Sequence, residues 1–490
     1  MNNNNTFEII FDNNEKYEWD PNLEFLNTEF INRVVNNRVI KTLSLPPKIK
    51  YLEIDIRAFK WQNKHLFDQL DYALLPNLKH LKLTGTYRKE IDFKNNLNLE
   101  ELEIISAKDL ENVDLSLNFN LKMMVLNQNN INELDLGSNY DLVSLNLSEM
   151  PLKNIDLSTL THLEALFIDN LKELNLINLD QNKDLKSLYL ANVDIEVIQL
   201  TNNTFLKDLA IINNNNIKEI IIENQNNIKE IILQTNKALN KLIIKQINEV
   251  KEINVSNNPM LENIVIANEI KAKLTNLYLL QSNLKTIELS NLDIFDFNVE
   301  SKNNLFFNLN NINVFKLSLS DITNDRLDFS VFANLKELSL SFTKLDSLDL
   351  MNINNLNKLS LVDNQSLKMI KNSSQSLKYI ELMDMNFDLF KNNEIMSNID
   401  HLKVSFANTF DISNLNKLET LSIDIDKKWA RTVELIATKN QQRNLFVRSL
   451  TTSFIRQGNS QWIQTPKTLW YRNNTDDSDT LREVKWTIVD

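Results

Sequence analysis

Four aspartates recur along the sequence at a nearly constant interval. Asp92, Asp114, Asp135 and Asp156 lie 21 or 22 residues apart. Carboxylates held close together repel one another, and a divalent cation or a basic partner would relieve that repulsion. The alternative interpretation, which we favour, is that exposed aspartates keep a surface solvated and bind nothing. We name this set the acidic ladder and predict no metal site for it.

Residues that carry out catalysis are scarce and scattered. The four histidines are His65, His80, His162 and His401, and the three glycines are too few for a glycine-rich phosphate loop. The complete lack of cysteine removes disulfides, thiolate metal sites and cysteine nucleophiles. We therefore predict that the chain is not an enzyme and has no cofactor and no small-molecule substrate.

A second recurring set is apolar. Phe167, Tyr189, Ala210 and Ile232 follow one another at intervals of 21 or 22 residues. Aromatic side chains beside β-branched ones are typical of the core of an interface. The alternative is that a loop, a terminal module or a neighbouring molecule covers them, or that β-propensity alone selected them. We take these four residues as the candidate partner-binding site.

Both sets lie inside a repeat that determines their spacing. An apolar triad of the form Leu-x-x-Leu-x-Leu begins every ten or eleven residues between Leu121 and Leu261. The last two apolar residues of each triad alternate across a short strand. An interval of this length leaves no room for a helix of roughly 8 to 20 residues. The triads begin at positions 121, 131, 142, 152, 163, 174, 185, 195, 206, 217, 228, 239, 250 and 261.

The repeat predicts a solenoid in which each coil of about 21 to 22 residues contributes two short parallel strands. Because successive triads lie on opposite sides of a coil, alternate triads should stack into two sheets. The fifth triad position points outward. The apolar set then belongs to the first sheet, whose triads begin at 99, 121 and onward, and the acidic ladder belongs to the second sheet.

The stretch from Leu126 to Leu142 reads Leu-Asn-Gln-Asn-Asn-Ile-Asn-Glu-Leu-Asp-Leu-Gly-Ser-Asn-Tyr-Asp-Leu. This pattern resembles the leucine-rich repeats, and most narrowly the nested 21-residue bacterial type known as IRREKO. The resemblance covers residues 78–423. It implies a right-handed solenoid, and proteins of this superfamily mostly bind other macromolecules.

Asparagines recur three residues past the last apolar residue of many strands, as at Asn118, Asn129 and Asn139. The chain must turn inward at this point, and a short amide can bond the backbone groups that the sheet leaves unpaired. Stacked amides can also bond one another along the column. We predict a structural asparagine ladder.

The repeat divides the chain into three parts. Residues 1–77 are predicted to form an N-terminal cap that contains the first strands, over 40–45 and 49–54, and an inserted helix within 59–75. Residues 78–423 form the solenoid, in which the irregular intervals at 294–312 and 387–399 predict inserted loops. Residues 424–490 form a C-terminal cap or a small α+β module, with a helix over 427–441.

Charge and hydropathy limit the function. A net charge of −12 argues against a general nucleic-acid surface, and no run approaches the roughly 18 apolar residues that span a membrane. The start of the sequence shows no ordinary secretory signal, so we expect a cytoplasmic protein or one exported by another route. We predict a non-enzymatic scaffold that binds a protein of unknown identity. The alternatives are a secreted or injected bacterial effector or toxin, whose C-terminal module acts, and a calcium-dependent surface adhesin.

Overall fold

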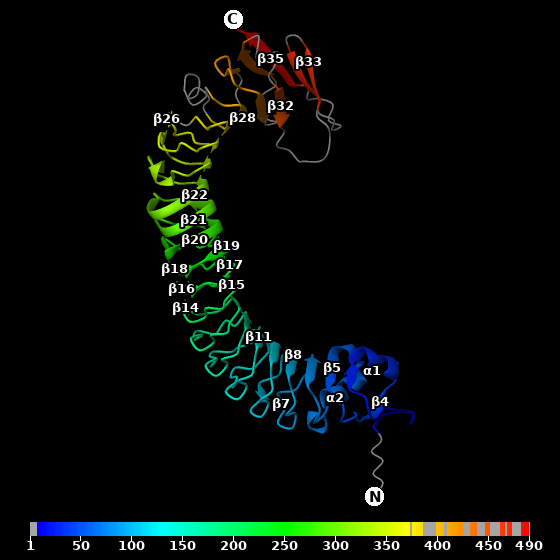
Figure 1. The fold of residues 1–490 in the computed structure, drawn as a ribbon. Coiled ribbons are helices and arrows are strands. Elements are labelled where there is room, and N and C mark those ends of the chain that lie inside the picture. Colours follow the sequence, from blue (N-terminus) through cyan, green and yellow to red (C-terminus); the bar gives the residue numbers. More distant parts are fainter. Residues whose placement is uncertain are drawn as a thin grey trace. The chain divides into compact units, whose positions relative to one another are not determined.

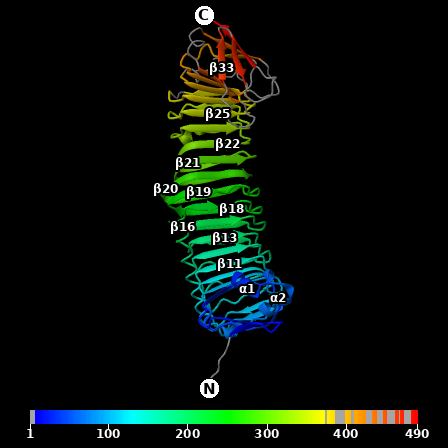
Figure 2. The same cartoon turned by 90° about the vertical axis from the view of Figure 1, so that its right-hand side faces the viewer.

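A computed structural model describes residues 7–372, 375–385, 398–405, 409–424, 432–438, 446–450, 461–465, 468–472 and 482–489. Its architecture is a β-solenoid of about 17 turns of parallel strands with few helices among the described residues (Figures 1 and 2), which confirms the predicted fold class. The chain divides into two compact units, Met1–Leu261 and Glu262–Asp490.

The first unit begins with a small antiparallel sheet rather than with a coil. Its order is β2-β1-β4, formed by Lys16–Glu18, Glu8–Phe11 and Ile40–Leu43. The predicted strand over 40–45 therefore belongs to this cap sheet and not to the solenoid, because Leu43 pairs with Ile9 in an antiparallel register.

Short helices complete the N-terminal region. The helix α1 (Thr28–Val35) begins where the side chain of Asn27 accepts the backbone N–H of Phe30 at 2.9 Å, which satisfies one unpaired donor of the first turn. The helix predicted within 59–75 is present as α2 (Trp61–Asp68). Two 3-10 helices flank it, η1 (Ile56–Ala58) and η2 (Tyr72–Leu74).

The first sheet of this unit is a continuous parallel ladder, as the alternate triads predict. Its inward residues are buried, with Leu145 1% and Ile231 0% exposed, whereas their neighbours point outward. In Figure 1 this sheet lines the inner side of the curve that the unit makes. Its strands are β3 (Phe25–Asn27), β5 (Tyr51–Asp55), β6 (His80–Thr84), β8 (Glu101–Ala107), β10 (Met123–Asn129), β11 (Ser144–Ser148), β12 (Ala165–Asp169), β13 (Ser187–Ala191), β15 (Asp208–Ile212), β17 (Glu230–Ile232) and β19 (Glu249–Asn254).

The second side of the same coils is less regular than predicted. Its strands are β7 (Glu90–Asp92), β9 (Asn112–Asp114), β14 (Val197–Leu200), β16 (Glu219–Gln225) and β18 (Lys241–Ile247). Between 115 and 196, a stretch described in full, this side has no paired strand. In these coils Asp135 and Asp156 turn back and accept the N–H groups of Gly137 and Ser158, both at 2.9 Å. Asp92 and Asp114 make the same turn in the coils that do pair, so the turn bends the chain at the end of the segment and does not explain the missing pairing.

Buried asparagines link consecutive coils of the first unit. The Asn118 amide donates to the carbonyl oxygens of Phe93 and Asn96 at 3.1 and 2.9 Å, and Asn139 repeats this contact one coil later toward Asn118. On the other turn of the coils, Asn214 donates to the side-chain oxygen of Asn236 at 3.0 Å. These bonds satisfy backbone groups that the tight corners remove from the sheet.

The second unit contains longer strands that also pair in parallel. The predicted loop at 294–312 is wrong, because 286–301 and 306–320 are strands joined by a short turn in which Leu305 is buried. In these coils the chain stays extended across the corner between the two sides. The strands are β20 (Asn263–Ser282), β21 (Thr286–Ser301), β22 (Phe306–Ser320), β23 (Glu337–Ser341), β25 (Lys358–Val362), β27 (Tyr379–Met383), β28 (His401–Ser405), β30 (Thr420–Asp424) and β32 (Phe446–Leu450).

Shorter elements accompany this sheet. A 3-10 helix, η3 (Phe329–Phe332), lies in the turn after β22. A two-stranded sheet pairs β24 (Ser347–Leu350) with β26 (Met369–Asn372). The loop predicted at 387–399 falls mainly on residues 386–397, which lie outside the described residues.

A five-stranded sheet contains the last described segments of the chain. Its order is β29 (Thr409–Asp411), β31 (Thr432–Ala437), β35 (Arg482–Ile488), β34 (Thr468–Arg472) and β33 (Gln461–Thr465). The helix predicted over 427–441 is wrong at 432–437, where β31 pairs in parallel with both β29 and β35. Pairing on both edges outweighs the weak helical pattern of this segment. The rest of that prediction, 427–431 and 439–441, lies outside the described residues.

Candidate partner-binding groove

The four predicted apolar residues form one row on the first sheet. Phe167 lies opposite Tyr189, Tyr189 opposite Ala210, and Ala210 opposite Ile232, on strands β12, β13, β15 and β17. All four are half-buried and point outward, whereas the preceding residue on each strand, such as Leu166, is buried. The strand alternation that the triads predict therefore places them on one surface.

The two aromatic rings of the row are stacked. The centroids of Phe167 and Tyr189 are 4.4 Å apart and their planes differ by 3°. Such a pair stabilises its own geometry by about 0.5–1.5 kcal/mol beyond the burial of its area. Since the next residue of the row is Ala210, the face of Tyr189 that points away from Phe167 is covered by no large side chain of that row. The rings are thus held in place while one aromatic face stays accessible.

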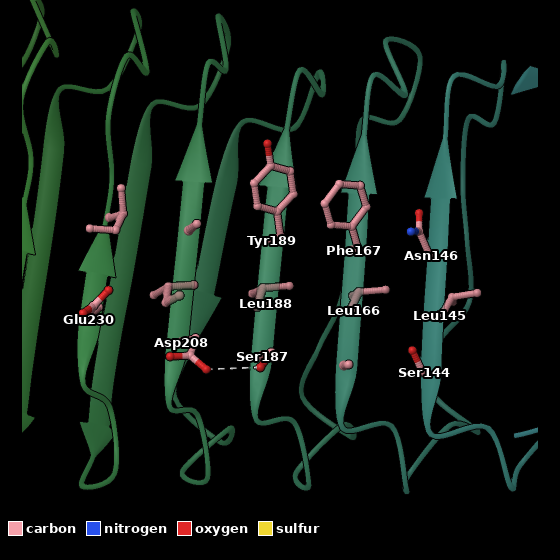
Figure 3. A pocket seen from close by; sticks show the side chains of 14 residues that line it. Ser144, Leu145, Asn146, Leu166, Phe167, Ser187, Leu188, Tyr189, Asp208 and Glu230 are labelled. Carbon is pink, nitrogen blue, oxygen red and sulfur yellow. Dashed lines mark hydrogen bonds between the residues drawn. The ribbon is translucent and has the colours of Figure 1, made fainter. Parts of the chain in front are cut away.

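The row lines a hollow that gives the surface its concave form. Its volume is about 410 Å³, and small residues, Ser144, Ala165 and Ser187, line it on three neighbouring strands (Figure 3). Ala165 and Ser187 lie two residues before Phe167 and Tyr189, and Ser144 lies two residues before Asn146, which pairs in register with Phe167. All three therefore share the outward face of their strands. These residues were not predicted from the sequence. The available signal was the third triad position, which is small in three consecutive coils.

Carboxylates border the apolar floor. Asp208 and Glu230 occupy the same triad position as Ser144, Ala165 and Ser187. Figure 3 shows them on the two strands beyond Ser187. The Ser187 hydroxyl donates to Asp208 Oδ2 at 3.4 Å, and Lys251 Nζ pairs with Glu230 Oε1 at 2.9 Å. Within the described part of the chain, Asp208 has no ion pair. The groove therefore combines an apolar centre with an acidic margin.

A third carboxylate lies near the hydroxyl end of Tyr189. Asp169 accepts a hydrogen bond from the Asn192 amide at 2.8 Å. Burial raises the pKa of the Tyr189 phenol above its usual value, and the negative charge of Asp169 raises that pKa further. The phenol therefore stays neutral and remains a hydrogen-bond donor over the ordinary pH range.

The acidic ladder lies on the second side of the coils, away from the groove. Asp92 and Asp114 pair in register, and Lys94 Nζ lies 3.8 and 2.9 Å from their carboxylates. The hydroxyl of Ser116, then Lys94, then the Ser116 N–H lower the pKa of Asp114 to about 2. The chain itself thus relieves the repulsion between the carboxylates of Asp92 and Asp114, for which the sequence suggested a bound cation.

The remaining ladder residues and the histidines are not gathered into a site. Asp135 and Asp156 each accept the N–H two residues ahead and lie in coils without a paired strand on that side. Over the described residues, no group of three or more histidine, aspartate or glutamate side chains could hold a metal ion. The histidines lie on separate segments: His65 on α2, His80 on β6, His162 before β12 and His401 on β28.

The coils define the class of the structure. Parallel strands recur every 21 to 22 residues, leucine and isoleucine fill the interior, and asparagine amides close many of the inner turns. This is a leucine-rich-repeat solenoid. The finer prediction of the nested 21-residue bacterial type stays a prediction.

The chain is similar to solved leucine-rich-repeat structures over most of its length. A functional domain of InlJ from Listeria monocytogenes is 16% identical with a TM-score of 0.28, over 92% of this chain and 84% of that one. A leucine-rich-repeat protein from Leptospira interrogans is 15% identical with a TM-score of 0.32, over 86% and 99%. YopM from Yersinia enterocolitica is 15% identical with a TM-score of 0.32, over 84% and 90%.

At these values the similarity supports no conclusion about function. No family model and no curated protein matches the sequence. Among the helices in the described ranges, none is both long enough and apolar enough to cross a membrane.

Proposed function

We propose that this protein is a non-enzymatic scaffold that binds a partner protein on the groove formed by Phe167, Tyr189, Ala210 and Ile232. One observation carries the proposal: these four residues form an unbroken apolar row, with a stacked aromatic pair, on the outward face of a rigid sheet. A row of this kind on a solvated sheet is typical of a contact surface. We propose that it is located in the cytoplasm or is exported.

Rigidity makes the row suitable as a set of anchors. Parallel strands on both sides hold each residue, and the Phe167 ring restricts the Tyr189 ring before any partner arrives. Little side-chain entropy is then lost on binding. Central aromatic anchors buried by a partner typically contribute about 2 kcal/mol or more each when they are truncated to alanine.

The test is a pull-down from a lysate of the source organism with the full chain as bait. The Phe167→Ala, Tyr189→Ala double variant should lose the partner that the unaltered protein recovers, because both anchors are removed. The matched control is Ser339→Ala, Ser360→Ala, which alters the same outward position on strands β23 and β25 of the second unit. Thermal melting of each variant shows that the fold is retained. Undiminished recovery with the first variant would exclude this groove.

A further inference from the structure

The row of the groove contains one narrow slot, located over Ala210. Tyr189 and Ile232 lie on the strands at either side, so roughly 9.6 Å, two strand spacings, separates their backbones. The Ala210 methyl forms the floor, the free face of the Tyr189 ring forms one wall, and Ile232 forms the other. Non-bonded carbon atoms pack at about 3.5–4.0 Å, so the slot accepts one flat group between its walls.

The slot opens toward a carboxylate on its own strand. Asp208 lies two residues before Ala210 and therefore on the same face, at roughly 7 Å along the strand. The side chain of Asp208 is exposed, and its hydrogen bond from Ser187 is long, at 3.4 Å. Glu230, on the neighbouring strand, is already paired with Lys251 at 2.9 Å. The side chain available to a cation in the slot is thus Asp208.

We propose that the slot receives an arginine side chain of the partner, whose guanidinium stacks on Tyr189 and pairs with Asp208. An apolar side chain next to this arginine fills the hollow over Ser144, Ala165 and Ser187. The inference rests on the proposed function, since it names the chemistry of the segment that binds the same groove.

The alternatives fit the slot less well. An acidic side chain would meet Asp208 and Glu230, and like charges repel. An aromatic side chain would fill the slot but would leave Asp208 without a counter-charge. The ammonium group of lysine is a compact point charge that cannot stack, whereas the planar guanidinium stacks on a ring and binds a carboxylate through two N–H groups. Flat shape and positive charge together select arginine.

The test uses a library of random peptides displayed on phage, selected on the purified full chain. The comparison variant is Asp208→Asn, which keeps an acceptor for Ser187 and removes the charge. The matched control is Asp156→Asn, which removes one charge on the opposite side of the coil and keeps an oxygen for the Ser158 N–H. The selected peptide is then synthesised with arginine and with neutral citrulline, and both dissociation constants are measured by calorimetry.

We expect peptides with arginine beside an apolar residue to be enriched by the unaltered protein and by Asp156→Asn, but not by Asp208→Asn. Replacing arginine by citrulline should weaken binding by about tenfold for the unaltered protein, and by much less for Asp208→Asn. Enrichment of apolar or acidic peptides without arginine, or equal affinity of the two peptides, would overturn the arginine proposal. In that case binding that still depends on Phe167 and Tyr189 would leave the proposed function standing. If no enriched peptide depends on those two rings, both proposals fail.

Discussion

At the outward position where the first unit carries Phe167 and Tyr189, the second unit carries Ser318, Ser339 and Ser360. The backbone is the same in both places, a parallel ladder without a register shift at these residues. The buried residues are also of the same kind. On this sheet the two regions therefore differ in their outer side chains, although the other sides of their coils also differ.

The charged residues beside these positions also differ between the two units. In the second unit, Lys316 pairs with Glu337 at 3.1 Å, Lys403 pairs with Glu381, and the Ser360 hydroxyl donates to Glu381 at 3.2 Å. Of these residues, all except Lys403 line a polar groove of about 280 Å³. At the groove of the second unit these carboxylates thus have partners within the chain, whereas the groove of the first unit has an apolar centre and an Asp208 without an ion pair. The groove of the first unit therefore gains more from a partner.

The repeat therefore constrains the interior and leaves the exterior free. Alternate residues of a strand point to opposite faces, so an outward residue can change from phenylalanine to serine without altering the packing of the coil. A function in binding can then be placed on a few coils of a long array. The predictions below test this separation of interior from surface.

The largest effect is expected from charging the interior of either unit. Ile231→Asp in the first unit and Leu338→Asp in the second each place a carboxylate at a position that is 0% or 1% exposed. A buried, unpaired charge typically lowers the free energy of unfolding by about 3–5 kcal/mol. Both variants should melt far below the unaltered protein in circular dichroism. If only one does, the two interiors are not equivalent.

A surface exchange should have a moderate effect on stability and a large one on binding. Phe167→Ser, Tyr189→Ser gives the first unit the surface of the second. Loss of the ring stack should lower the free energy of unfolding by about 1 kcal/mol, measured by urea titration. Partner recovery should disappear. A loss of stability as large as that of Ile231→Asp would show that the rings support the fold rather than binding.

A smaller effect is expected from the charges of the second unit. Glu337→Ala removes the partner of Lys316, and their side chains are 39% and 35% exposed. A pair this accessible to solvent contributes less than about 1 kcal/mol, and salt weakens it. A double-mutant cycle with Lys316→Ala should give a coupling energy in this range at low salt and near zero at high salt. A coupling that salt does not change would mean that the pair is shielded.

The smallest effect concerns ionisation in the groove. Because burial and then Asp169 raise the pKa of Tyr189, the phenol binds its proton more tightly in the folded state. The resulting stabilisation is fully present below the unfolded-state pKa of about 10 and is lost as the pH rises through the folded-state pKa. Asp169→Asn should lower the Tyr189 pKa. Alkaline absorbance titrations, each compared with the same protein carrying Tyr189→Phe, measure the change, and an unchanged pKa would show that Asp169 has no influence.

The sequence by itself determined the repeat and, through it, much of the candidate site. The triad spacing identified the inward residues, such as Ile231, and placed Phe167, Tyr189, Ala210 and Ile232 on one sheet. This was possible because a strand alternates its faces with a period of two and because the coil length is nearly constant. Both are local rules that a single sequence can reveal.

Tertiary structure decided the remaining features, because they depend on contacts between segments. The antiparallel pairing of 40–43 and the double pairing of 432–437 bring together strands that are distant in the sequence. From the sequence alone, the acidic ladder is a row of carboxylates that repel one another. In the structure, Lys94 pairs with Asp114, and the Gly137 N–H donates a hydrogen bond to Asp135. The stacking of Tyr189 on Phe167 and the hollow beside them require atoms from three coils at once. A hydrophobic pattern places residues on a face, but only the packed coils decide which of them leave room for a partner.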